Sequence, residues 1–208
     1  MSHFVAGACA AWHPASPVTT TPSRAYGGEL PMLSWSIRPA LATDVPLLGP
    51  LEDRAGQRFR ESVHAYCADF SHFDAGYLAR LAAAGTVWVA VGADDTPIGF
   101  AIAEPRGGEG YLHELDVDLA HGRRGVGRAL VRRVAEWARS VDFETLLLST
   151  FDDVPWNAPS YQRLGFEIVP LHAYDDAMRA QRQRDASAGM RLESRVMMRA
   201  PVAKLLAN

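Results

Sequence analysis

The sequence has few cysteines, no long apolar run and little net charge, and each of these absences excludes a class of protein. Two cysteines among 208 residues are too few for a disulfide framework, and no cluster of Cys and His has the spacing of zinc ligands. No apolar run approaches the roughly 20 residues that span a bilayer. The short apolar stretch Phe4–Trp12 follows no Lys or Arg, so it makes a poor signal peptide. We therefore expect a cytoplasmic protein that has no membrane partner and binds no metal.

Positive and negative charges nearly balance along the chain. Lys and Arg number 21 against 24 Asp and Glu, which gives a formal net charge of -3. Such a chain has no excess of positive charge with which to hold a nucleic acid, so we expect no nucleic-acid partner. Hydrophobic residues make up 48% and charged residues 22% of the sequence, as in a soluble globular protein, and the length suits one domain.

The N-terminal part of the sequence lacks the pattern of a folded domain. Residues 13–31 are rich in Pro, Ser, Thr and Gly and have little apolar surface to bury. Periodic sequence begins only near Trp35. We therefore predict that residues 1–33 form a disordered extension and that residues 34–208 form the folded domain. Because Met32 stands directly before the periodic sequence, we expect residues 1–31 to be a mis-assigned start or a dispensable tail.

The rest of the chain alternates between strand-like and helix-like segments. β-Branched and aromatic runs predict strands, and apolar residues that repeat with helical spacing predict helices with one apolar face. Asp44 is the expected N-cap of the first helix, because Asp is favoured at that position. Strands are expected at 34–38, 86–92, 98–104, 111–118, 145–150, 166–170 and 195–199, and helices at 44–60, 74–84, 125–139, 159–164 and 172–185. Hairpins as well as crossovers in this order predict an α/β domain with a mixed sheet.

A turn rich in glycine and arginine joins the fourth predicted strand to the third predicted helix. The first N–H groups of a helix have no acceptor within the helix, and the helix dipole adds partial positive charge there. Gly125 and Gly127 lack the Cβ atoms that would keep a pyrophosphate from these N–H groups. Arg123, Arg124 and Arg128 add positive charge at the rim. The turn is therefore a candidate anion site, although a Gly-Val-Gly turn taken alone favours a tight strand-to-helix turn with solvated arginines.

Two other nucleotide-binding motifs do not fit this turn. A P-loop requires Gly-Lys followed by Ser or Thr, whereas Gly127 is followed by Arg128 and Ala129. A Rossmann fingerprint requires a third small residue three places after the second glycine, where this chain has Leu130. The glycine loop also comes late, after a hairpin. The sequence therefore favours neither class.

A second motif follows at 156–166, with the sequence Trp-Asn-Ala-Pro-Ser-Tyr-Gln-Arg-Leu-Gly-Phe. Together with the glycine turn, it resembles the GNAT superfamily of N-acetyltransferases, whose first motif opens the third helix and whose second carries an Asn, a Tyr on a short helix and a closing Gly-Phe. The residues that match are Gly125, Gly127, Tyr161, Gly165 and Phe166. The resemblance covers roughly residues 37–170. It implies a single α/β domain whose mixed, mostly antiparallel sheet is splayed between its fourth and fifth strands and flanked by helices.

The resemblance also implies acetyl-CoA as the co-substrate. Its pyrophosphate would lie on the glycine turn, and its pantetheine arm would pair with the main chain of the fourth strand. Where relatives have Gln or Arg, this chain has Gly122, which still offers a backbone N–H. Asn157 would orient the cofactor or cap the short helix. The cofactor-binding residues implied in this way are Leu115, Asp116, Val117, Gly122, Arg123, Arg124, Gly125, Val126, Gly127, Arg128 and Asn157.

Direct transfer of an acetyl group to an amine requires a polarised carbonyl, a neutral amine and a proton for the departing thiolate. The resemblance assigns the first task to a backbone N–H near Val117 and the last to Tyr161. A free Tyr has a pKa of about 10, so it is protonated at neutral pH and can donate its proton. The alternative for Tyr161 is a packing role. Glu114 is our first candidate for the base and His113 the second; for both, substrate binding or a satisfied polar contact is the alternative. Period-two alternation predicts Glu114 and Asp116 on one face of the strand and His113 on the other.

The acceptor remains the most open part of this interpretation. The resemblance implies a primary amine of a small molecule, bound beneath the segment 57–74, and it makes a homodimer the usual assembly. One alternative is a protein or peptide N-terminus as the acceptor. A second is a non-catalytic regulator that binds acyl-CoA, against which the presence of Tyr161 and of acidic residues on the fourth strand stands.

Overall fold

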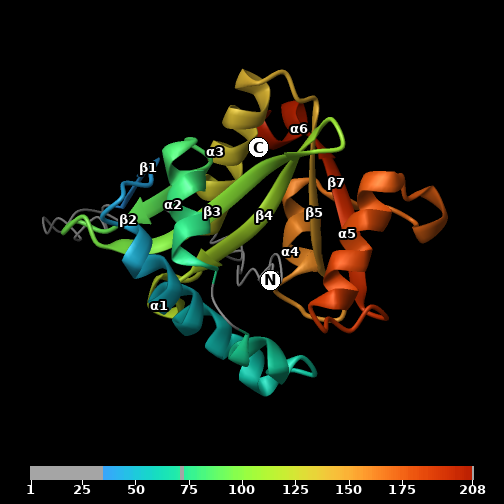
Figure 1. The fold of residues 1–208 in the computed structure, drawn as a ribbon, viewed down its shortest axis with the longest axis horizontal. Coiled ribbons are helices and arrows are strands. Elements are labelled where there is room, and N and C mark those ends of the chain that lie inside the picture. The colour runs from blue at the N-terminus through green and yellow to red at the C-terminus, as the bar shows by residue number, and fades with distance from the viewer. Residues whose placement is uncertain (1–34, 71–72, 208) are drawn as a thin grey trace, which may run out of the picture.

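The computed structural model describes residues 35–70 and 73–207, and it shows one mixed sheet with helices on both faces (Figure 1). The strand order is β1-β2-β3-β4-β5-β7-β6. Every neighbouring pair is antiparallel except β4 and β5, which run parallel. The predicted α/β domain with a mixed, mostly antiparallel sheet is thereby confirmed. The predicted N-terminal extension lies outside the described residues.

Each predicted strand and helix has a counterpart in the structure. The strands are β1 (Ser36–Pro39), β2 (Val87–Val91), β3 (Pro97–Arg106), β4 (Glu109–Val117), β5 (Thr145–Phe151), β6 (Glu167–Ile168) and β7 (Arg195–Pro201). The α-helices are α1 (Val45–Gly56), α2 (Ala75–Ala83), α3 (Val126–Ser140), α4 (Ala158–Leu164), α5 (Asp176–Ser187) and α6 (Val202–Ala207). Short 3-10 helices are η1 (Gln57–Glu61), η2 (Ala65–Asp69), η3 (Leu119–His121) and η4 (Leu171–Ala173). The 3-10 helices and α6 were not predicted.

The two faces of the sheet carry separate apolar cores. On one face, Leu130 of α3 lies in a buried cluster with Leu115 of β4. On the other, Leu48 of α1 lies in a cluster with Phe100 of β3. Because successive strand residues point to opposite faces, β4 presents Leu115 to α3 and Asp116 to the side of α1.

The central strands β4 and β5 pair over a short distance and then separate. Gly110 pairs with Leu146 and Tyr111 with Leu147, and the two strands share no further pair. Beyond these residues β4 stays with β3 and β5 stays with β7, so an opening widens between them (Figure 1). The predicted splay between the fourth and fifth strands is therefore present.

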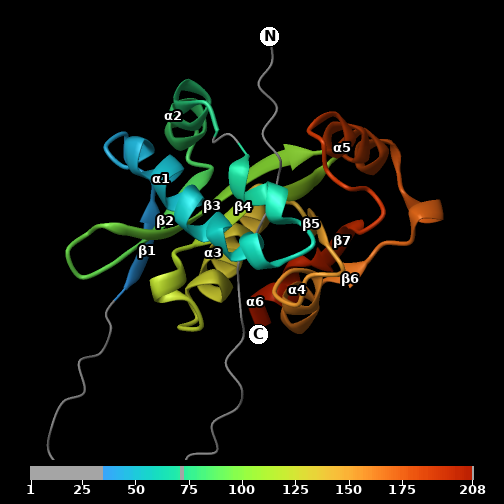
Figure 2. The same cartoon turned by 90° about the horizontal axis from the view of Figure 1, so that it is seen from below.

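A segment between α1 and α2, residues 57–70, crosses this opening, and we call it the bridging segment (Figure 2). The ring of Phe59 packs edge-on against Phe151 of β5, with the centroids 6.2 Å apart. Nε2 of His64 lies 2.8 Å from Oδ1 of Asp153, just beyond β5. The segment therefore connects the α1 side of the opening to the β5 side.

Asp44 occupies the predicted N-cap position of α1 but does not cap the helix. Its carboxylate instead accepts hydrogen bonds from Arg38 Nη1 at 2.6 Å and from the backbone N–H of Leu41 at 2.7 Å. The predicted N-cap position of Asp44 is confirmed, but its side chain makes no capping bond, because Arg38 of β1 binds the carboxylate instead. This ion pair attaches the start of α1 to β1.

Candidate active site

The glycine turn has the geometry of an anion site. Gly125 is the N-cap of α3 and has φ 83°, a left-handed conformation that favours glycine. Arg123 is also left-handed, with φ 64°. The side chains of Arg123, Arg124 and Arg128 are exposed at the rim, while Val126 is buried at the start of the helix. The first N–H groups of a helix of 15 residues, together with these guanidinium groups, suit a pyrophosphate.

Gly122 departs from the predicted role in one respect. Its N–H donates a hydrogen bond to the carbonyl of Leu119 at 3.3 Å and so closes η3. A phosphate at this position would have to replace that bond. The backbone N–H of Gly122, which we predicted to bind the cofactor, is therefore already hydrogen-bonded within the chain.

An extra residue in β4 changes the predicted arrangement of its polar side chains. Ile102 of β3 pairs with Glu114, while the next residue of β3 pairs with Leu112, so His113 forms a bulge. The ring of His113 lies 5.2 Å from the ring of Phe73, in the core on the α1–α2 face. His113 and Glu114 therefore share a face. The prediction of opposite faces was wrong, because period-two alternation assumes one residue for each step of pairing.

Glu104 of β3 holds His113 in place. Nδ1 of His113 lies 3.2 Å from Oε2 of Glu104, the hydroxyl of Tyr77 donates to the same carboxylate, and Arg106 approaches it to 3.0 Å. Burial raises the pKa of Glu104, but His113, Tyr77 and Arg106 outweigh burial and lower it to about 2. Since Glu104 contacts His113, Tyr77 and Arg106 together, His113 belongs to a structural polar network, and Glu114 stays the first candidate for the base.

Two polar side chains of α4 are buried without hydrogen-bond partners among the described residues. Tyr161 is 1% exposed and its hydroxyl has no partner; Asn157 is 0% exposed and both polar atoms of its amide lack one. Asn157 is the N-cap residue of α4, but its side chain makes no capping bond. The capping alternative was therefore wrong. Since buried polar groups are nearly always hydrogen-bonded, these atoms fit contacts with a ligand.

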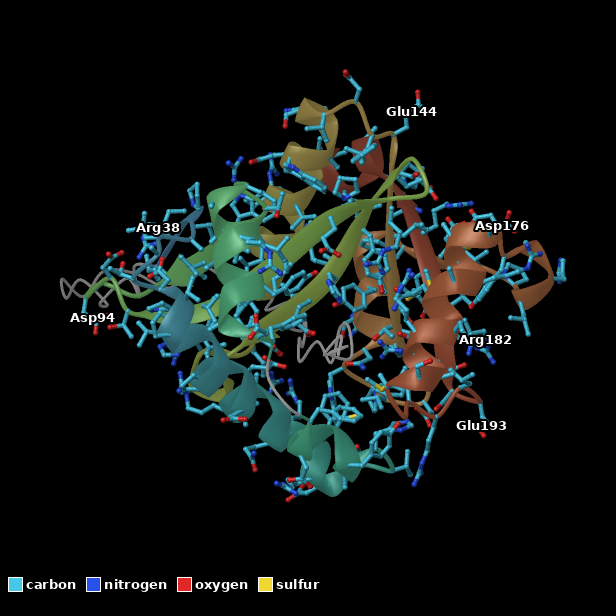
Figure 3. All side chains as sticks on the ribbon, in the orientation of Figure 1. Arg38, Asp94, Glu144, Asp176, Arg182 and Glu193 are labelled. Atoms are coloured by element: carbon cyan, nitrogen blue, oxygen red, sulfur yellow. The ribbon has the colours of Figure 1, made fainter. Side chains whose placement is uncertain are left out.

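Carboxyl groups gather on the β4 side of the opening. Charged side chains such as those of Glu144, Asp176 and Glu193 project from the periphery of the molecule (Figure 3), whereas Glu114 is 1% and Asp116 is 2% exposed. Burial raises the pKa of Asp116 well above its usual range, and the charges of its carboxylate neighbours raise it further. Buried carboxyl groups that raise one another's pKa in this way do not all ionise at neutral pH.

Burial and the same carboxyl groups raise the pKa of two further side chains, Glu52 and Tyr161. Burial, assisted by repulsion from Glu114, raises the pKa of Glu52 to about 9. Burial, followed by the charges of Glu114 and Asp116, raises the pKa of Tyr161 well above its ordinary value. The Tyr161 hydroxyl therefore keeps its proton at neutral pH, as its candidate role requires.

A pocket of about 370 Å³, which includes space open to solvent, reaches from the surface to β4. It is lined by Glu52, Asp53, Gly56, Cys67, Ala68, Phe70 and Asp116. Sequence reasoning missed Glu52, although a signal exists: it follows Leu48 by one helical turn, so it lies close to the buried face of α1. Cys67, Ala68 and Phe70 of the bridging segment form one wall of this pocket.

The arrangement fits coenzyme A in three separate respects. The turn at Gly125 suits a pyrophosphate, the main chain of β4 beyond Tyr111 has no partner on β5, and α4 offers Asn157 and Tyr161. In residues 35–70 and 73–207, no three His, Cys, Asp or Glu side chains are placed to hold a metal ion. No helix in the described part of the chain is long and apolar enough to cross a membrane.

Known structures share this fold. The PaiA N-acetyltransferase of Thermoplasma acidophilum, in complex with coenzyme A, superposes with a TM-score of 0.60 at 13% identity, over 81% of this chain and 99% of that one. A ribosomal-protein alanine N-acetyltransferase of Escherichia coli gives 0.53 at 20% identity, over 81% and 94%. N-acetylglutamate synthase of Neisseria gonorrhoeae, with coenzyme A and N-acetyl-glutamate, gives 0.60 at 16% identity, over 81% of this chain but 35% of that longer one. At these identities the likeness is one of fold.

A sequence model of the acetyltransferase (GNAT) family matches residues 52–166. The match begins at Glu52, spans β4 and the glycine turn, and ends just after α4, so it contains most of the site described above. The chain therefore belongs to the GNAT family of acetyltransferases, acyltransferases that use acetyl-CoA.

Proposed function

We propose that the protein transfers the acetyl group of acetyl-CoA directly to a primary amine of a small molecule. The observation that carries this proposal is the placement of a buried, unpartnered Tyr161 hydroxyl within the electrostatic reach of Glu114 and Asp116, where β4 and β5 separate. A proton donor and carboxylates are thus available in one water-poor site.

The binding of the donor is assigned to main-chain groups. The N-terminus of α3, with Gly125 and Gly127 and the rim arginines, would hold the pyrophosphate. Leu115 and Val117 have side chains in the core on the α3 side, so their contribution would come from the β4 main chain. The amide of Asn157 would donate to or accept from the pantetheine arm. A backbone N–H near Val117 would polarise the acetyl carbonyl.

The proton transfers follow from the positions of the acidic groups. Glu114 takes a proton from the acceptor ammonium, either directly or through water, which leaves a neutral amine. The amine nitrogen bonds to the acetyl carbon as the carbon–sulfur bond breaks, and the nitrogen gives up its second proton. Tyr161 donates a proton to the leaving sulfur and is reprotonated by the proton that nitrogen releases. The net products are the amide, free coenzyme A thiol and one proton.

The walls of the pocket support a small molecule as the acceptor. Cys67 and Ala68 of η2, together with Phe70, line the pocket opposite Asp116 of β4. An acceptor peptide requires an extended groove instead. The position of the bridging segment beside the pocket is the observation that favours an amine of low molecular weight over a protein N-terminus.

The experiment that tests this function combines binding with turnover. Calorimetric titration with acetyl-CoA should show micromolar binding by the wild type and none by a Gly125→Glu, Gly127→Glu double variant. Gly108→Glu is the matched control, because Gly108 also has a left-handed φ of 83° but lies in the β3–β4 hairpin, where an added Cβ meets nothing within 4 Å. Release of thiol is then followed with a panel of amines and of N-terminal peptides. Binding of acetyl-CoA without acetylation of any amine would contradict the proposal, and acetylation of peptides alone would assign the acceptor to proteins.

A further inference from the structure

The pocket between α1, η2 and β4 is strongly acidic, and we call it the acidic pocket. Its lining includes the carboxyl groups of Glu52, Asp53 and Asp116 and no Lys, Arg or His. Arg54, the arginine of α1, turns to Asp118, with 2.6 Å between Nε and Oδ2. Buried carboxyl groups are normally paired with a cation or kept neutral. Burial keeps Glu52 and Asp116 protonated in the ligand-free protein, and a positively charged occupant would stabilise their ionised forms.

Asp116 gives an independent indication of a ligand. Its side chain is 2% exposed and borders the acidic pocket, and its Oδ2 atom has no hydrogen-bond partner among the described residues. A buried oxygen without a donor carries an uncompensated loss of hydration. An N–H group of a ligand in the acidic pocket would supply that donor.

The remaining lining determines the shape of the occupant. Gly56, Cys67, Ala68 and Phe70 offer small or apolar surfaces between the carboxyl groups. Such surfaces suit methylene groups, and the face of an aromatic ring attracts a cation. Since no three acidic, Cys or His side chains in the described part of the chain are placed to hold one metal ion, the carboxyl groups suit an extended organic cation.

Glu52 is held in place at the edge of the acidic pocket. The backbone N–H of Phe73 donates to its carboxyl group, which anchors the side chain to the segment that follows the bridging segment. Glu52 and Asp116 also act electrostatically on each other, so they lie close together although they come from α1 and β4. A cation between them would allow both groups to ionise.

We infer that the acidic pocket binds a second cationic nitrogen of the acceptor, so that the protein prefers aliphatic diamines to monoamines. This inference rests on the proposed function. The distal ammonium lies against Glu52 and Asp116, and the amine that is acetylated lies at Glu114, two residues away along β4. The methylene chain between the two nitrogens passes over Ala68 and Phe70.

The test compares 1,4-diaminobutane with 4-amino-1-butanol, which has the same chain but replaces the distal ammonium by a hydroxyl. Wild-type protein should acetylate the diamine with a kcat/KM at least about tenfold higher, the effect of one charged hydrogen bond. In Glu52→Gln, which keeps the size and the acceptor oxygen for Phe73, the preference should fall to within about twofold. Glu61→Gln is the matched control, since Glu61 is exposed on η1 and does not line the acidic pocket.

A second measurement needs no turnover. Calorimetric titration of the coenzyme A-saturated protein with 1,4-diaminobutane should show binding that Glu52→Gln weakens at least about tenfold and Glu61→Gln leaves unchanged.

The outcomes separate this inference from the function on which it rests. Equal acetylation of the diamine and the amino alcohol by the wild type would overturn the inference and leave the proposed function intact. Binding of the diamine that depends on Glu52, without acetylation of any amine, would support the subsite and refute the catalytic assignment. Absence of both binding and turnover would overturn both.

Discussion

Replacing Tyr161 by Phe should slow acetyl transfer and at the same time stabilise the protein. The hydroxyl is buried in the core that α3 and α4 share, and it has no hydrogen-bond partner among the described residues. A buried polar group without a partner costs about 1–3 kcal/mol. Removing only this oxygen should therefore raise the free energy of unfolding of the ligand-free protein by up to that amount. For a domain of this size, the melting temperature rises by about 2–4 °C per kcal/mol.

The effect on catalysis has the opposite sign. Without its hydroxyl, position 161 has no proton to donate to the leaving sulfur, and general acid catalysis contributes about 10²–10⁴-fold to a rate. We therefore expect kcat for the best amine to fall by at least about a hundredfold, with the affinity for acetyl-CoA nearly unchanged. Urea unfolding followed by circular dichroism and the release of thiol at saturating acetyl-CoA measure the two effects.

Tyr174→Phe provides the contrasting control. The hydroxyl of Tyr174 is buried and accepts a hydrogen bond of 2.8 Å from the backbone N–H of Met197. Its removal should lower the free energy of unfolding by about 1–3 kcal/mol and leave kcat unchanged, because a buried donor loses its acceptor. If Tyr161→Phe instead loses stability and keeps its kcat, the Tyr161 hydroxyl is a structural group and our assignment of the acid is refuted.

Three other predictions address the electrostatics and the packing around the site. The pKa of Glu52 is about 9 in the folded protein and 4.5 in an unfolded chain. Between these two pH values the folded protein keeps a proton that the unfolded protein has lost. The free energy of unfolding therefore falls as the pH rises from 4.5 to 9, by up to about 1.4 kcal/mol per pH unit. Glu52→Gln should remove this decline, so urea unfolding should show a larger gain in stability at pH 8 than at pH 5; an equal gain at both would contradict the shift. Asp185→Ala should lower the free energy of unfolding by about 3–5 kcal/mol, because Ser149, Gln181 and Arg195 all donate to this buried carboxylate. A loss below about 1 kcal/mol in the same assay would show that these hydrogen bonds are dispensable. Gly99→Ala would bring a Cβ to 2.8 Å from the carbonyl oxygen of Asp116. The resulting shift of β4 should lower the free energy of unfolding by about 1–3 kcal/mol and weaken the binding of acetyl-CoA measured by calorimetry. Unchanged affinity would show that β4 does not contact the donor.

The sequence predicted the order of strands and helices because most segments have a clear period. The strand at Val87–Val91 is entirely β-branched, aromatic or small and apolar, and α3 has an apolar stripe that faces the sheet. The glycine turn was located for the same reason, since the end of a strand and the start of a helix enclose it. The predicted helix to Arg60 becomes a 3-10 helix after Gly56, although Phe59 continues the buried face of α1.

Sequence patterns alone did not identify the bulge or the acidic pocket. The run from Leu112 to Val117 alternates except where His113 and Glu114 stand together, and only the pairing with β3 shows that this break is an extra residue. Glu52 looks like one member of a solvated acidic pair in α1. Its burial results from contacts with β4 and with the segment near Phe73, which are far apart in sequence.

The separation of β4 from β5 also determines how the molecule behaves as a folding unit. Two residue pairs, at Gly110 and Tyr111, are the only ladder between a half-sheet of β1 to β4 and a half-sheet of β5, β7 and β6. The bridging segment and α3 supply the other connections across this seam. A ligand that fills the opening touches both halves, so its binding free energy also joins them. Amide exchange at the seam should therefore slow when the site is occupied, because a bound ligand holds the two half-sheets together.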